Sequence, residues 1–139
     1  MRTLGQFAVL VTGLAGLALA APLTAQTDAD LSSGERELAE ILEGREAGEP
    51  VKCLTRLESD GVQLVDGTAF VFRDGGTIYV NRPRNARLID EFDLPIFRQF
   101  SGDLCRLDQV EMRDRGSSIP GPYVILEDFV PYRKTGEEG

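Results

Sequence analysis

Two turn signals, Asp66-Gly67 and Asp74-Gly75-Gly76, divide residues 62–81 into three short runs of strand-forming residues. Asp-Gly accepts the positive φ angles of a type I′ turn, so the first signal predicts a tight hairpin. The second turn leads directly into a further alternating run, which predicts three antiparallel strands in consecutive order. Because side chains alternate between the faces of a strand, we expect one buried face to carry Phe70, Phe72, Ile78 and Val80.

The patterns are weaker after this pair of hairpins. Residues 82–85 predict a loop, since the proline within them cannot donate to a ladder. Residues 88–100 fit a short helix, an irregular crossing or an edge strand, and these alternatives stay open. Strand character returns at 104–112, where a change of phase indicates a bulge near Asp108-Gln109. A last strand region is expected at 123–130.

An amphipathic helix is expected before the strands, at residues 33–47. Ser32 and Glu35 have the spacing of a capping box, and Pro50 follows the helical pattern. The stretch 28–49 carries eight acids and two bases, which indicates a solvated acidic face. The apolar stripe expected to lie across an open face of the sheet consists of Leu31, Leu38, Ile41 and Leu42.

The sequence therefore predicts a mainly β (α+β) fold. We expect a small antiparallel sheet curled toward a barrel or roll, with one N-terminal amphipathic helix. The expected segments are a signal peptide at 1–25, an acidic N-terminal segment with the helix at 26–49, a β-rich domain at 50–134 and a polar tail at 135–139.

The N-terminal segment has the pattern of a secretory signal peptide. Met1-Arg2 is a short positive region, and residues 7–21 form an uncharged apolar run. That run is shorter than the roughly 20 residues needed to span a bilayer. Cleavage is expected after Ala20 or Ala25. The sequence thus predicts a periplasmic or secreted protein with no stable membrane insertion after cleavage.

Composition removes several classes of function. The chain has no His, which excludes Ser/His/Asp and Cys/His nucleophiles and His-ligated metals. Its net charge of −8 argues against nucleic-acid binding, which needs a cationic surface. We therefore expect no cofactor and no metal. In an exported chain, Cys53 and Cys105 predict a disulfide, with free buried thiols as the alternative.

Three groups of residues are candidates for function. Arg82, Arg84 and Arg87 form a compact basic group that fits contact with an anion or a partner, and charge compensation is the competing interpretation. Tyr79 is the best candidate for an exposed aromatic side chain, ahead of Tyr123 and Tyr132. Paired carboxylates can carry hydrolysis, and the acids form two clusters. The first cluster is Asp90, Glu91 and Asp93, and the second is Asp103, Asp108, Glu111 and Asp114. Calcium-loop spacing is absent from both clusters, and Asp108 is more typical of a residue that satisfies backbone N–H groups.

Spaced motifs along the chain also resemble a known family. The motifs lie at residues 42–53, 65–69, 79–83, 104–108, 114–117 and 129–134. They resemble small exported proteins of sphingomonad-type alphaproteobacteria that share a domain of unknown function. The resemblance implies export and a single domain, and it supplies no activity and no site residues. Related sequences often carry further cysteines, so it also implies that the two cysteines here pair with each other.

The sequence assigns no catalytic residue. It favours a non-catalytic periplasmic binding or structural module with an unknown envelope component as its partner. The alternative is a small hydrolase that uses paired carboxylates. An enzyme of that kind needs two of the named acids within about 5–10 Å of each other, facing one pocket.

Overall fold

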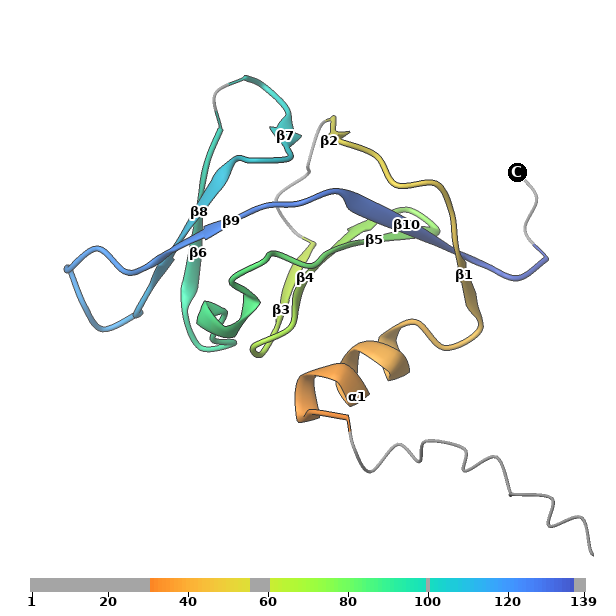
Figure 1. The fold of residues 1–139 in the computed structure, drawn as a ribbon, viewed down its shortest axis with the longest axis horizontal. Coiled ribbons are helices and arrows are strands. Elements are labelled where there is room, and N and C mark those ends of the chain that lie inside the picture. The colour runs from red at the N-terminus through yellow and green to blue at the C-terminus, as the bar shows by residue number, and fades with distance from the viewer. Residues whose placement is uncertain (1–30, 56–60, 100, 137–139) are drawn as a thin grey trace, which may run out of the picture.

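The computed structural model of this protein describes residues 31–55, 61–99 and 101–136 (Figure 1). The expected signal peptide at 1–25 and the last three residues of the expected tail lie outside these described residues. Within them, the chain forms one α-helix, one short 3₁₀ turn and ten strands in three antiparallel sheets. No helix in the described ranges combines the length and apolar character that crossing a membrane requires.

The largest sheet has five strands and contains the predicted hairpins. Its order is β1 (Arg45–Ala47), β10 (Phe129–Lys134), β5 (Thr77–Asn81), β4 (Ala69–Asp74) and β3 (Val62–Val65). The consecutive pairing of β3, β4 and β5 confirms the three predicted strands. The predicted type I′ turn is wrong, because three residues separate the paired Val65 and Ala69, and only Gly67 among them has a positive φ (+58°).

A second sheet has three strands in the order β6 (Leu94–Arg98), β8 (Gln109–Arg113) and β9 (Tyr123–Ile125). It resolves the alternatives for residues 88–100, because β6 is an edge strand that follows the 3₁₀ turn η2 (Ala86–Leu88). An edge position tolerates Pro95, which has no N–H to donate. The expected last strand region at 123–130 is divided, since β9 belongs to this sheet and β10 to the five-stranded sheet.

A third, two-stranded sheet carries the predicted disulfide. β2 (Cys53–Leu54) pairs with β7 (Leu104–Cys105), and the two cysteines lie directly opposite each other and are bonded. The predicted bulge near Asp108 is instead a turn. Leu107 has a φ of +74°, and the chain leaves β7 there to enter β8 in a different sheet.

The helix α1 (Ser33–Ile41) is shorter than the predicted range of 33–47. Ser32 caps it as expected, because its hydroxyl accepts a hydrogen bond from the Glu35 amide. The helix ends before Gly44, whose positive φ of +69° turns the chain into β1. Gly34 lies against the turn after β3, where a Cβ would be 2.1 Å from the Thr68 hydroxyl oxygen.

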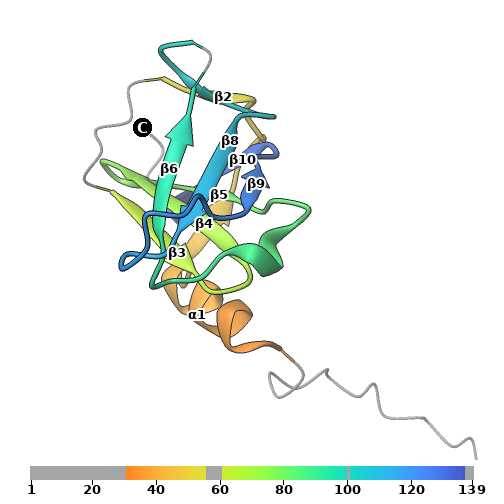
Figure 2. The ribbon, with the colours of Figure 1, turned by 90° about the vertical axis from the view of Figure 1, so that its left-hand side faces the viewer.

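The five-stranded sheet is covered on both faces, which makes three layers (Figure 2). Leu38 of α1 packs on one face against apolar side chains that include Val71, Ile78 and Val80. The three-stranded sheet covers the other face, where Phe70 and Phe72 belong to its apolar cluster. Phe70 and Phe72 therefore lie on one face and Ile78 and Val80 on the other, so the expectation that all four share one face is wrong.

The register explains this error. Phe72 pairs with Tyr79 and Val71 with Val80, so each pair shares a face. Tyr79 consequently packs, half-buried, beside Phe72, and it is not the exposed aromatic that the sequence predicted. The mainly β fold with one helix is confirmed. The expected barrel or roll is not confirmed, because each described sheet runs from one edge strand to another without closing.

Candidate functional site

The outer face of the three-stranded sheet turns away from the core. Pairing of Ile96 with Glu111, and of Glu111 with Tyr123, places these three side chains on one face. The opposite face packs Val110, Met112 and Val124 into the core. By this register, the outer face consists of Leu94, Ile96, Arg98, Gln109, Glu111, Arg113, Tyr123 and Ile125.

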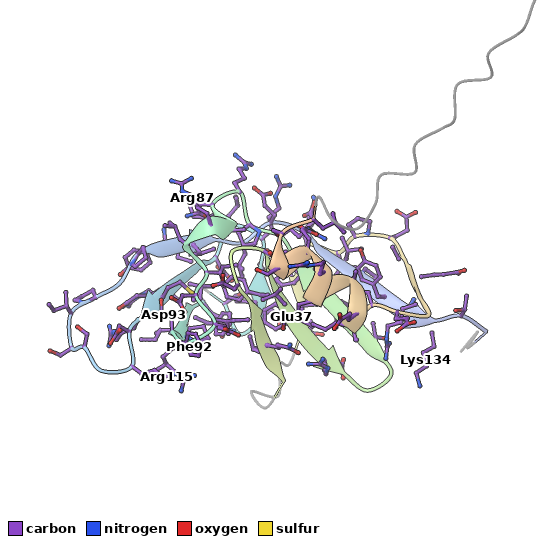
Figure 3. All side chains as sticks on the ribbon, turned by 90° about the horizontal axis from the view of Figure 1, so that it is seen from below. Glu37, Arg87, Phe92, Asp93, Arg115 and Lys134 are labelled. Atoms are coloured by element: carbon purple, nitrogen blue, oxygen red, sulfur yellow. A yellow bond between two sulfur atoms is a disulfide. The ribbon has the colours of Figure 1, made fainter. Side chains whose placement is uncertain are left out.

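Large apolar side chains on this face remain exposed. The exposed fractions are 46% for Leu94, 42% for Tyr123 and 44% for Ile125. Phe92 and Ile119 are more exposed still, and they lie on the two loops at the end of the sheet where Leu94 pairs with Arg113. Figure 3 shows Phe92, Asp93 and Arg115 close to one another at this end, where Arg115 Nε donates to the Phe92 carbonyl. Apolar and aromatic side chains beside arginine are typical of protein-binding surfaces.

Glu111 lies fully buried at the centre of this face, under two guanidinium groups. Arg98 Nη2 donates to Glu111 Oε2 at 2.8 Å, and Arg113 Nε donates to Glu111 Oε1 at 2.9 Å. The hydrogen bonds from Arg98 and then from Arg113 lower the pKa of Glu111. Arg98 also lies over the Tyr123 ring, with its guanidinium carbon 5.9 Å from the ring centroid. The buried carboxylate therefore holds two cations in place, and one positive charge remains uncompensated.

The predicted arginine loop borders this face. The Asn85 side chain donates to the Tyr123 carbonyl at 2.8 Å and accepts from the Ile125 amide at 3.3 Å, so the loop covers the free edge of β9. Two of the three arginines already have acidic partners. Arg82 forms a bidentate pair with Glu35 at 2.5 and 3.0 Å. Those hydrogen bonds raise the pKa of Arg82.

The other two arginines of this loop differ from each other. Arg84 pairs with Glu127. Arg87 is exposed and has no ion pair with any residue that the structure describes. The three side chains therefore do not converge on one anion, and for Arg82 and Arg84 the geometry matches charge compensation.

Four of the acids named as catalytic candidates, Asp90, Asp108, Glu111 and Asp114, accept hydrogen bonds within the protein. Asp108 is buried and accepts from the Cys105 amide at 2.8 Å, as the sequence predicted. Asp90 and Asp114 each accept from a backbone N–H two residues ahead. Burial raises the pKa of Asp93, and the nearby carboxylates of Asp90 and Asp114 add to this effect. Glu111 has no exposed surface, and its hydrogen bonds from Arg98 and Arg113 favour the ionised form, which is the opposite of what a general acid needs.

Two hollows in the described surface lie elsewhere. One, of about 370 Å³, lies on the outer side of α1, beside Arg36 and Glu40. The other, of about 230 Å³, lies between Arg82, Asp128 and Tyr132. Neither is lined by the candidate acids. Among the residues that the structure describes, no group of three or more Cys, Asp or Glu side chains is placed to hold a metal ion.

Comparison of the chain with protein-family models, with curated proteins and with solved structures gave no match. The resemblance to exported alphaproteobacterial proteins therefore has no support from these comparisons and stays a prediction.

The outer face as a unit is not recognisable in the sequence. From the sequence, Glu111 is one acid of a catalytic cluster, and residues 88–100, which include Arg98, fit a helix, an irregular crossing or an edge strand. The i, i+2 spacing of charges in Glu111 and Arg113 indicates two ions on one strand face. The third charged partner, Arg98, lies beside Glu111 only because β6 pairs with β8.

Replacement of Glu111 by Gln tests the role of this buried carboxylate. Its pKa is lowered in the folded protein from an ordinary value of 4.5. Ionised Glu111 therefore stabilises the fold fully above about pH 4.5, and this stabilisation is lost as pH falls through the lowered pKa. We expect E111Q to be less stable than the wild type at neutral pH, with a gap that closes on acidification. Urea unfolding of both proteins from pH 7 to pH 3 measures it. A gap independent of pH would contradict the assignment.

Proposed function

We propose that this protein is an exported, non-catalytic binding module whose partner docks on the outer face of the three-stranded sheet. The observation that carries the proposal is the combination of exposed Leu94, Tyr123 and Ile125 with two guanidinium groups held by a buried carboxylate. Tyr and Arg are among the residues most enriched at binding hot spots. Because Glu111 fixes both arginines in advance, little side-chain entropy is lost when they meet a partner.

Export is supported by two features. Residues 7–21 have the length and apolar character of a signal peptide. The Cys53–Cys105 disulfide includes an exposed cysteine, and such bonds persist in oxidising compartments. The proposed location is therefore the periplasm or the exterior of the cell.

Charge indicates the chemistry of the partner. The net charge of −8 disfavours nucleic acid and anionic bilayers as general partners. The outer face is a local exception, since Arg98 and Arg113 together exceed the single charge of Glu111. We propose an envelope protein that presents a carboxylate between apolar side chains. Arg87, on the short 3₁₀ turn that follows Asn85, is a further exposed cation.

The hydrolase alternative has less support. Burial raises the pKa of Asp93, as the acid of a hydrolase would require. Its neighbours Asp90 and Asp114 are occupied by backbone hydrogen bonds, and these acids line neither of the two hollows described above.

Site-specific crosslinking tests the proposed function. A photoreactive residue in place of Tyr123 is expected to crosslink one envelope protein in the source cells. The same residue at Ala39, which is exposed on the helix, is the matched control and is expected to give no such product. Adding R98S to the Tyr123 variant should reduce the yield at least several-fold. Equal yields from Tyr123 and Ala39, or a yield unaffected by R98S, would refute the docking face.

A further inference from the structure

The strand β3 ends the five-stranded sheet with backbone groups that have no partner among the described residues. The tight turn after β4 pairs Asp74 with Thr77, so alternate residues of β4 bond to β5. The Arg73 amide instead donates to the Gly61 carbonyl, on the β3 side. By the same alternation, Gln63 and Val65 bond to β4, and the N–H and C=O groups of Val62 and Leu64 point outward.

The other edges of the two larger sheets carry features that discourage pairing. The strand β1 bears Arg45 and Glu46, and β6 contains Pro95. The side chain of Asn85 occupies the free edge of β9. Charges, prolines and covering side chains are the usual protection of sheet edges. The segment Val-Gln-Leu-Val of β3 has no charge and no proline, so this edge is the least protected in the described part of the chain.

We propose that β3 pairs with β3 of a second copy of this chain, which joins two five-stranded sheets into one continuous antiparallel sheet. The strand is self-complementary in one register, in which Val62 of each copy lies opposite Leu64 of the other. Both residues have outward N–H and C=O groups, so this register forms four backbone hydrogen bonds, and Gln63 lies on the two-fold axis.

Local charge favours a second copy as the occupant of this edge. The chain carries a net charge of −8, so most of its surface repels an identical chain. Beside β3, the negative charge of Glu37 and the positive charge of Arg73 balance each other. Gln63 Nε2 donates to Glu37 at 2.9 Å, and Arg73 Nη1 donates to Gln63 Oε1 at 2.9 Å. Val62 and Leu64 are half-buried against the aromatic cluster, so pairing continues that apolar layer across the axis.

Amide hydrogen exchange provides a direct test that is independent of the proposed function. In the purified protein, the amides of Val62 and Leu64 are expected to become protected as protein concentration rises. The amides of Gln63 and Val65 bond to β4 in every state, so they are the internal control and should be protected throughout. Exchange at Val62 and Leu64 that is fast at all concentrations would overturn the proposal, as would protection that does not depend on concentration.

Introducing a charge at the axis gives a second test, read by sedimentation equilibrium. Two like charges meet at the axis in Q63K and in Q63E, so each variant is expected to sediment at the monomer mass at concentrations where the wild type sediments at twice that mass. An equimolar mixture of Q63K and Q63E should recover the doubled mass. Circular dichroism confirms that each variant is folded.

The control for this test is I125K, which alters the outer face of the three-stranded sheet. It is expected to leave the doubled mass unchanged. The proposal would be overturned if I125K lost the dimer or if the mixture failed to associate. It would also be overturned if the wild type stayed monomeric up to millimolar concentration. Association of β3 only with a different protein would overturn it as well.

Discussion

Reduction of the disulfide is expected to lower the free energy of unfolding by about 4 kcal/mol. The bond joins Cys53 and Cys105, which are 52 residues apart, and closing a loop of that length removes much of the conformational freedom of the unfolded chain. β2 and β7 are two-residue strands whose pairing joins Cys53 to Cys105 and Leu54 to Leu104, so the disulfide closes a very short ladder. Urea unfolding with and without reductant measures the change, and thiol titration of unfolded, unreduced protein should find no free thiol among the two cysteines.

The double variant C53A/C105A is the matched control for this measurement. It should show the same loss of stability as the reduced wild type, and reductant should no longer affect it. An unfolding midpoint of the wild type that is unchanged by reduction would contradict the prediction that the bond stabilises the fold. The effect is large because domains of this size are stabilised by only about 5–15 kcal/mol in total.

The hairpins could be predicted from the sequence because each turn depends on only a few adjacent residues. Gly67 and Gly75 both adopt positive φ, which is the property that made these positions recognisable as turns. The assignment of β4 and β5 side chains to faces was wrong, because alternation gives the repeat within one strand but not the register between two strands. A two-residue loop at Gly75-Gly76 pairs Phe72 with Tyr79, and this pairing decides which residues share a face. Both faces of β4 are buried, so apolar character could not correct the phase.

The candidate site was only partly predictable, for a related reason. Arg98 and Glu111 are thirteen residues apart and meet only because β6 pairs with β8. The strand pattern of β6 is obscured by Pro95, which an edge strand accepts and a central strand does not. The arginine loop was recognised from its composition, yet the partners of Arg82 and Arg84 come from distant elements. Ion pairs between distant elements leave no local pattern in a sequence.

Replacement of Gly121 by Ala is expected to cost about 3 kcal/mol of stability. Gly121 lies where the chain returns over β8 to begin β9, and the adjacent Pro122 carbonyl accepts a hydrogen bond from the Met112 amide. A Cβ at Gly121 would be 1.5 Å from the Met112 carbonyl oxygen and 2.6 Å from its carbon. Both atoms belong to the backbone of a fully buried residue, so no side-chain rotation relieves the clash. Either β8 or the return segment must move.

Gly102 is the matched control, since a Cβ there meets nothing within 4 Å and its φ is not positive. G102A should change stability by no more than about 0.5 kcal/mol in either direction. Elsewhere, a Gly to Ala change gains stability by restricting the unfolded chain, so a loss in G121A reflects the close approach and not the residue type. Urea unfolding of both variants separates them. Equal stability would mean that the segment after β8 does not lie against Met112, and with it the register that brings Tyr123 beside Glu111 would fail.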